Sequence, residues 1–587
     1  MAKKSRVPST ELERWLSRIK RAESIRDDAD KKYGFTRALQ QFQGDYEKAI
    51  PKYAMNMDLI PINEVYAFTK TFVPSVYSRD PFIAINPKGM KWIAGAKILE
   101  LAINAYWREL RLKREIRRVM FDAVFAEGWM KTGYSAVTEK DDTAPLESSE
   151  YVKSEEIFAV RVSWKNMVKD PDAVNGIKDA RWVAQQIIKP LEIVKKSSLY
   201  ENTKDLTPSH IASYPTDPKY RTDNYKDEIE YVCLWEVWDR DSQEVFTVSE
   251  QGDKFLMKKD WPYEMEGFPY ELLRFNENPD EAYSPNLIQA WEPQLWEKIK
   301  LRSMQLDHLK RFGRQMAAEK GSLTPAEAQK YKQGQSGSLI FFEPGKQPPV
   351  PIPYPQIQSD MYGVGSLIDL DKDNISGQPN AVRSAPQKTQ SRTLGEIDRL
   401  IAAFQSRQSE PQSLIEDFSG EVAYKLIALM KQFISAPKFV RATQTDMAAI
   451  VQALVDPETG EPMFDDTGFK FTKEQIQGTE FEVDVRAGST LPLNKETRLD
   501  SLISILKLGP TIGIQPGGHV SRVLGKAILG DLEMKEVEQA YDKEMQDMEN
   551  EKTIAMAAEK GKLDIVDSQI ESLREQNREG MSGGGIQ

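Results

Sequence analysis

The side chains that most often perform catalysis are scarce in this sequence. Only three histidines occur, His210, His308 and His519, and they lie far apart along the chain. The one cysteine, Cys233, cannot form an internal disulfide, and no cluster of cysteine and histidine has the spacing of a structural zinc site. His308 follows an aspartate on a charged helical segment, which favours a solvated side chain over a general base. These residues predict neither a nucleophile nor a metal centre.

Short motifs give the same result. GxxxxGK[ST], HExxH and CxxC do not occur. Lys495 lies seven residues after Gly488, but the second glycine and the following hydroxyl of a phosphate-binding loop are missing. Asp170 and Asp172 flank Pro171 and could hold a cation, although an Asp-Pro turn is the more ordinary interpretation. With 90 acidic residues in the chain, carboxylate pairs alone indicate nothing. We therefore expect a protein that is not an enzyme and uses no cofactor.

The overall charge limits the classes of partner. The net charge is -11 at pH 7 and the pI is about 5.3, which argues against a protein whose main task is to hold nucleic acid by its phosphates. DNA could still slide past an acidic wall, because repulsion prevents sticking. No run approaches the roughly 18 apolar residues of a membrane span, and the N-terminus leads into a charged helix rather than an apolar signal. The sequence predicts a soluble protein of a reducing compartment, without a membrane partner.

The longest periodic segment is a predicted helix over residues 394–434. Its apolar side chains recur every three or four residues, which places them on one side of an α-helix. At about 1.5 Å per residue the helix would span roughly 60 Å. Pro411 lies in the same seam, so we expect a kink or a break there. Helices of this length are typical of large symmetric assemblies, and a core helix of an ordinary α-rich protein is the alternative.

The N-terminal half mixes helical and strand patterns. Apolar spacing and caps predict helices over residues 10–48, 63–74 and 92–125, the last closed by Gly128 and Gly133. Alternating or β-branched runs predict strands, and the four residues 239–242 fit a hairpin turn between the last two. The predicted strands cover residues 80–87, 134–137, 157–162, 181–188, 231–238 and 244–248. At 587 residues we expect two to four domains of the α+β class, mainly α.

Two further helices enclose a small insertion. Ser284 and Pro285 open the first, predicted over residues 284–312, in the favoured order of a cap and then a proline. The insertion over 313–355 contains a short helix, a strand at 337–342 and proline-rich extended chain. The second helix, over 356–374, is weakened by two glycines.

The segment that follows, residues 375–393, contains glycine and proline but no acidic residue. Its cations are Arg383, Lys388 and Arg392. A flexible basic loop in an acidic protein could touch a DNA backbone without reading its sequence, and a plain linker is the alternative. Near the C-terminus, a predicted helix over 531–551 holds nine acids against two lysines, so its narrow apolar stripe needs partners such as identical neighbours in a ring.

The order of these elements resembles that of the portal proteins of tailed bacteriophages, over roughly residues 45–546. The likeness depends on several stretches in a fixed order, because each is weakly specific alone. They are PINEV at 61–65 with FVPSVYSRDP at 72–81, the helix at 100–109 with GWMKTGY at 128–134, DPDA at 170–173 with WEVWD at 235–239, the helix–insertion–helix–loop–long helix series, and FEVDV at 481–485 before GSTLP at 488–492.

The resemblance implies a ring, usually of twelve subunits, at one vertex of the capsid. Such a ring is the channel for packaging and ejecting the genome in the virion, and it assembles in the host cytoplasm. The partners it implies are identical subunits, double-stranded DNA passing through without sequence preference, capsid protein, the terminase large subunit, and head–tail adaptor or tail proteins.

The resemblance also divides the chain. It implies a portal-like fold with an α/β wing (1–283), a stem of two helices (284–312 and 356–374), a clip (313–355), a channel loop (375–393), a long kinked wing helix (394–436), a crown with C-terminal helices (437–577) and a disordered tail (578–587). Arg383, Lys388 and Arg392 would then contact DNA, and Pro411 would mark the kink. The clip would meet the motor and the adaptor through Leu339, Phe341, Phe342 and Tyr354.

Two other classes stay open. One is a hydrolase or nucleotide-binding enzyme whose site is dispersed along the sequence. The other is a different structural virion protein, such as an internal capsid protein, which would lack a ring with an axial hole.

Overall fold

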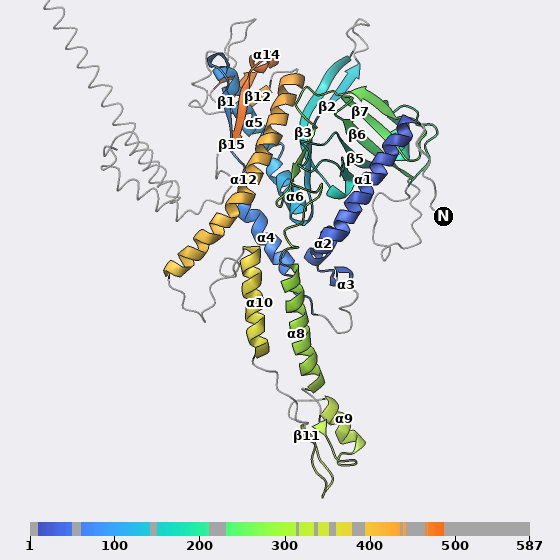
Figure 1. Cartoon of the computed structure of the whole chain (residues 1–587), viewed down its shortest axis with the longest axis vertical. Coiled ribbons are helices and arrows are strands. Elements are labelled where there is room, and N and C mark those ends of the chain that lie inside the picture. Colours follow the sequence, from blue (N-terminus) through green and yellow to red (C-terminus); the bar gives the residue numbers. More distant parts are fainter. Residues whose placement is uncertain are drawn as a thin grey trace, which may run out of the picture. The chain divides into compact units, whose positions relative to one another are not determined.

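The computed structural model describes residues 10–49, 60–140, 150–209, 230–312, 316–333, 339–351, 360–377, 394–434, 438–441, 464–465 and 468–485. The chain forms two compact units, Met1–Leu491 and Pro492–Gln587, and all the described residues belong to the first. Helices and strands are mixed along this unit, which confirms the α+β class (Figure 1). The predicted crown helices beyond residue 485, the acidic helix at 531–551 and the tail lie outside the described residues.

The N-terminal helical stretch is divided by two glycines. It forms α1 (Glu11–Tyr33), α2 (Phe35–Gln43) and α3 (Tyr46–Ala49). Gly34 and Gly44 stand between them with φ of 70° and 80°, a left-handed conformation that glycine adopts at little cost. The helix α1 begins with a capping box, in which Thr10 and Glu13 each accept a hydrogen bond from the other's backbone N–H.

Two predicted helix boundaries were wrong. The helix α4 (Glu64–Val76) starts after Asn63, whose side chain caps it as expected, but it continues two residues past Pro74. The predicted helix over 92–125 is two helices, α5 (Ile93–Glu109) and α6 (Leu112–Phe125), preceded by the short turn η2 (Met90–Trp92). Arg111 makes the break with a φ of 52°, and the apolar spacing hides it because both helices bury one face in the same core.

Gly128 and Gly133 do not close a helix. Both lie inside the strand β2 (Gly128–Lys140), which begins six residues before the predicted strand. A Cβ atom at Gly128 would overlap the carbonyl oxygen of Val119, and one at Gly133 would come within 2.5 Å of the Phe158 ring. The glycines therefore permit α6 and the neighbouring strand to approach β2 closely.

Two antiparallel sheets form the β-rich part of the unit. In the first, β2 lies between β3 (Glu150–Val162) and β9 (Tyr270–Leu273). The second has the order β4-β5-β6-β7-β8, and its β6–β7 pair confirms the predicted hairpin, with Asp239 opposite Glu244. Its strands are β4 (Met167–Lys169), β5 (Trp182–Pro190), β6 (Tyr231–Asp239), β7 (Glu244–Ser249) and β8 (Met257–Asp260). The short helices η3 (Trp164–Asn166) and α7 (Leu191–Lys196) flank β4 and β5.

Smaller sheets join distant parts of the chain. The predicted edge strand is β1 (Ile83–Pro87), and its partner is β15 (Phe481–Val485), with Ile83 opposite Val485. A three-stranded sheet has the order β12-β14-β13, and a two-residue pair joins β10 to β11. These strands are β12 (Lys438–Arg441), β13 (Phe464–Asp465), β14 (Gly468–Phe471), β10 (Met316–Ala317) and β11 (Val350–Pro351); the helix α14 (Lys473–Ile476) follows β14.

The long helix α12 (Leu394–Phe433) matches its prediction to within one residue. It runs through Pro411 without interruption, so the break that was one of the two expected outcomes does not occur. Figure 1 shows a change of direction part-way along α12. A kink caused by Pro411 itself stays a prediction.

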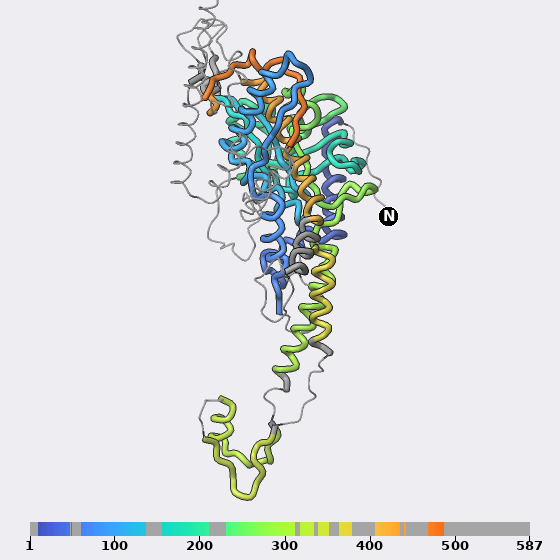
Figure 2. The backbone as a smooth tube through the Cα atoms, turned by 90° about the vertical axis from the view of Figure 1, so that its left-hand side faces the viewer, coloured from blue at the N-terminus to red at the C-terminus, as the bar shows by residue number. Residues whose placement is uncertain are grey.

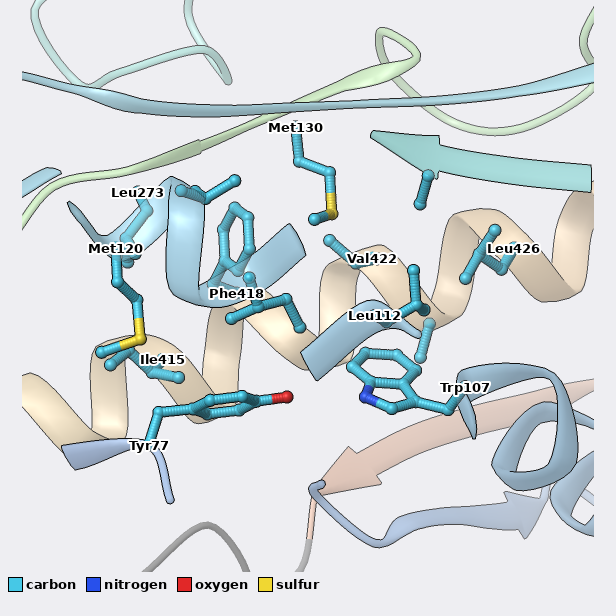
Figure 3. Packing of buried hydrophobic residues seen from close by; sticks show 14 of the residues in the cluster. Tyr77, Trp107, Leu112, Met120, Met130, Leu273, Ile415, Phe418, Val422 and Leu426 are labelled. Atoms are coloured by element: carbon cyan, nitrogen blue, oxygen red, sulfur yellow. The ribbon is translucent and has the colours of Figure 1, made fainter. Parts of the chain in front are cut away.

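The largest hydrophobic core lies between α12 and the helices of the N-terminal half. Ile415 and Val422 of α12 meet Leu112 and Met120 of α6 in one cluster, beneath Met130 of β2 (Figure 3). All five side chains are fully buried. A buried aliphatic side chain contributes about 1.5–3 kcal/mol to stability relative to an exposed one. This cluster therefore holds α6 and α12 against the β3-β2-β9 sheet. No helix in the described part of the chain has both the length and the apolar composition to cross a membrane.

Candidate functional site

The two predicted stem helices pack side by side. They are α8 (Glu292–Phe312) and α10 (Asp360–Ser376), and they are antiparallel, because Lys298 pairs with Asp369 while Leu301, further along α8, lies beside Gly365, earlier on α10. Figure 2 shows the same pair in adjacent positions. The short helix α9 (Pro325–Gln333) and the strands β10 and β11 belong to the insertion between them.

The boundaries of this pair differ from prediction at both ends. The helix α8 begins at Glu292 and not at Ser284, because Asn286 first forms a turn, accepting hydrogen bonds from the N–H groups of two following residues at 2.9 and 2.8 Å. Pro293 then falls in the first turn, where its missing N–H costs nothing. The helix α10 extends two residues into the predicted loop and ends at Gly377, which has a φ of 68°.

A cluster of four charged side chains fixes the pair to α4. Glu64, the first residue of α4, accepts from Lys298 of α8 at 2.7 Å and is also paired with Lys372 of α10. Asp369 of α10 completes the cluster by pairing with both lysines. The Lys372 side chain is 3% exposed and that of Glu64 is 11% exposed. Three helices from distant parts of the sequence are therefore joined at one point.

The electrostatics of this cluster favour its ionised form. Burial opposes ionisation of Glu64, but hydrogen bonds from Lys298 and Lys372 outweigh it, so the pKa of Glu64 is lowered. The pKa of Asp369 is lowered for the same reasons, with Lys298 as its main partner. The pKa of Lys298 is raised, because its two carboxylate partners outweigh its partial burial.

The apolar face of α8 is buried in the first half of the helix and exposed in the second half. Leu295 and Ile299 in the first half are fully buried, whereas Met304 and Leu309 in the second half are 48% and 55% exposed. On α10 only one large apolar side chain, Ile368, is buried among those the structure describes. Four others are exposed: Val364, Leu367, Leu370 and Ile375. This second apolar face was not predicted, although the spacing of residues 364, 367 and 370 was a signal for it.

The insertion exposes the predicted clip residues. Leu339, Phe341 and Phe342 are 77%, 67% and 50% exposed. The predicted strand at 337–342 was wrong, because residues 339–342 form no strand; the N–H of Phe341 donates to a carboxylate of α9, which holds this segment locally. Tyr354 lies outside the described residues.

The predicted DNA-contacting residues Arg383, Lys388 and Arg392 also lie outside the described residues. Within the described part, the acidic pair considered for a cation is already occupied. The guanidinium of Arg181 binds Asp170 and Asp172 at 2.6 Å each. Burial favours the neutral carboxyl, but the hydrogen bonds from Arg181 lower the pKa of Asp170. No group of three or more potential metal ligands occurs among the residues that the structure describes.

Buried charges elsewhere serve packing. Lys169 is fully buried, pairs with Glu127, and has a pKa that burial lowers to about 8. Lys425 of α12 donates to the backbone oxygens of Phe268 and Tyr270 at 2.6 Å and pairs with Glu271. These contacts tie strands and helices together.

Comparison with models of protein families gives no match for this sequence, and comparison with curated protein sequences gives none either.

Proposed function

We propose that this chain is the subunit of a portal ring at one capsid vertex, which acts as the channel for double-stranded DNA during packaging and ejection. The observation that carries the proposal is the α8–α10 pair. It exposes six large apolar side chains, and a buried charge cluster fixes it to α4. A monomer rarely leaves so many apolar residues uncovered on one helix pair. Identical neighbours around a ring would cover them, as expected of a portal stem.

The insertion between the two helices supports the same proposal. Three large apolar side chains are exposed within four residues, which is typical of a binding surface. We assign this surface to the terminase motor and the head–tail adaptor. The β-rich part with α12 corresponds to the wing, which faces capsid protein.

The first test is electron microscopy of the purified chain, with native mass spectrometry of the same sample. We expect rings with a central hole and a mass near a dozen copies. A monomer or a dimer under conditions that preserve assemblies would contradict the proposal. A saturable small ligand or a turnover would favour an enzyme, and a closed shell without an axial hole would favour another virion protein.

A variant test addresses the stem directly. Leu367→Asp combined with Leu370→Asp places two charges on the exposed face of α10, so ring formation should be lost while the secondary structure is retained. The control is Ile193→Asp on α7, a site that is 59% exposed but belongs to no helix pair. Rings that form normally with the double variant would show that this face is not a subunit contact.

The predicted channel loop, residues 375–393, is tested by DNA packaging and retention and not by ring assembly. Replacing Arg383, Lys388 and Arg392 by glutamine removes all the cations of the predicted channel loop. We expect impaired packaging or DNA retention with normal ring assembly, because non-specific contact with DNA depends on these charges. Normal packaging by this variant would refute the assignment of the loop.

A further inference from the structure

Two open cavities of opposite charge lie in the wing part of the unit. The first, which we call the basic cavity, has a volume of about 1150 Å³ and is formed by α4, the end of α5, α6 and Arg161 of β3. Eight cationic side chains and three carboxylates line it. The cavity therefore has an excess of positive charge, although the net charge of the whole chain is -11.

Half of the cationic side chains in the basic cavity have no carboxylate or hydrogen-bond partner among the described residues. Glu115 pairs with Arg118 at 2.7 Å, and Asp122 pairs with Arg161 at 2.6 Å. The third carboxylate, Asp80, forms no ion pair in the described part of the chain. Four cations have neither a carboxylate partner nor a hydrogen bond to the described residues, namely Lys70, Arg111, Lys113 and Arg114.

The second cavity, the acidic cavity, has a volume of about 900 Å³. It is formed by α12, β15, residues 175–178 and residues 271–277, and seven carboxylates and three cations line it. Glu271 is paired with Lys425, and Glu421 with Lys178 at 3.1 Å. Four carboxylates lack a cationic partner among the described residues, namely Glu277, Asp417, Glu482 and Asp484.

The two cavities lie on outer faces of helices that share a core. The inner faces of α6 and α12 meet in the cluster of Figure 3. At 100° per residue, Arg114 lies on the side of α6 opposite to its buried residues, and Asp417 lies on the corresponding side of α12. One unit therefore presents unpaired positive charge on one outer helix and unpaired negative charge on another.

We propose that the surface around the basic cavity of one subunit contacts the surface around the acidic cavity, on α12 and β15, of the next subunit. This inference rests on the proposed ring, and it names the wing surfaces that join neighbours. Two different, complementary surfaces make a head-to-tail contact, which closes into a ring when the rotation between copies closes. Four unpaired cations opposite four unpaired carboxylates provide charge complementarity, which fixes orientation and excludes wrong pairings.

Charge reversal on each face tests the contact. The basic-face variant carries Lys70→Glu and Arg114→Glu, and the acidic-face variant carries Glu277→Lys and Asp417→Lys. All four side chains are exposed and have no carboxylate or cationic partner within the described part of the chain, so the fold should tolerate the changes. Each variant alone places like charges across every contact, and we expect the fraction in rings to fall at least about tenfold.

The complementary arrangement should restore assembly. A variant with all four changes again faces opposite charges, so its ring fraction should return to within about twofold of the natural chain. Mixing the two single-face variants should also give rings, with the two kinds of subunit alternating. Native mass spectrometry distinguishes these rings by subunit mass, and circular dichroism of each variant checks that it is folded.

The outcomes separate this inference from the proposed function. If the natural chain forms rings and both single-face variants also form them, the proposed wing contact is wrong but the proposed ring is not. The same conclusion follows if the natural chain forms rings but neither the fourfold variant nor the mixture regains ring assembly. If the basic-face variant keeps its rings but loses DNA binding, the basic cavity belongs to a phosphate backbone and the contact is equally wrong. If the natural chain forms no ring, both proposals fail.

Discussion

Removing the Glu64 carboxylate should loosen α10 from the rest of the unit. Breaking a buried ion pair by deleting one partner costs about 3–5 kcal/mol. Glu64→Gln leaves Lys372, whose side chain is 3% exposed, with Asp369 at 3.2 Å and Asp373 at 4.0 Å as its remaining carboxylate partners. Asp369 and the retained amide oxygen compensate in part, so we expect a loss of about 2 kcal/mol in the free energy of local opening.

Amide hydrogen exchange of α10 in the full chain measures this loss directly. About 2 kcal/mol corresponds to roughly 30-fold faster exchange at amides that exchange through local opening. The matched control is Glu192→Gln on α7, which removes a carboxylate from a pair whose side chains are 81% and 86% exposed. That pair should contribute at most about 0.5 kcal/mol, so its loss should leave exchange nearly unchanged.

A second substitution identifies the cause. If the penalty of Glu64→Gln is an uncompensated buried ammonium, adding Lys372→Met should recover at least half of the lost protection, because the buried charge is gone. Unchanged exchange of α10 in Glu64→Gln would refute the anchoring role of the cluster. Equal acceleration in α10 and in α1 would show global destabilisation in place of local release.

Other features of the unit lead to separate predictions. The lowered pKa of Glu64 means that its stabilising effect is complete above the ordinary carboxyl pKa and declines as pH falls toward the lowered value, which acid-dependent exchange of α10 should show. Burial lowers the pKa of Lys169 to about 8, so between pH 8 and the ordinary lysine pKa the unfolded chain binds more protons than the folded chain. The free energy of unfolding, measured in denaturant, should therefore rise with pH over this range, and a Lys169→Met variant should not show this increase. Burial raises the pKa of Cys233 to about 11, so iodoacetamide at pH 8 should label it only as fast as its sheet opens, and rapid labelling of the native protein would contradict this. Gly128→Ala should lower the melting temperature by overpacking, at a cost of about 1–3 kcal/mol, whereas Gly363→Ala, with open space around the new methyl group, should not.

Local patterns were sufficient for elements that neighbouring residues in the sequence determine. The long helix α12, the β6–β7 hairpin and the Asn63 cap were predicted because each depends on residues close in sequence. The helix break at Arg111 and the positions of Gly128 and Gly133 within a strand were not predicted, because they depend on what packs against those residues. A glycine that ends a helix and a glycine that admits a neighbouring helix look the same in a sequence.

The candidate site was less predictable than the fold. The sequence indicated two helices around an insertion, but it did not show that Glu64, about 230 residues before Lys298 in the chain, would join them. Neither the charge cluster nor the two charged cavities has a sequence motif, since each gathers side chains from distant segments. The exposed face of α10 was visible only as an irregular pattern, because apolar residues on two sides of a helix blur its periodicity.

The pairing of β1 with β15 has a consequence for synthesis. Ile83 is made early, and its partner Val485 is made roughly 400 residues later. At about 5–20 residues per second, β1 waits on the order of 20–80 s for its neighbour. During that time a strand edge beside the main core is exposed on the nascent chain, where other strands can pair with it. The first unit therefore completes its fold only after nearly all of its length has left the ribosome, and the speed of elongation sets how long the unfinished subunit is open to aggregation.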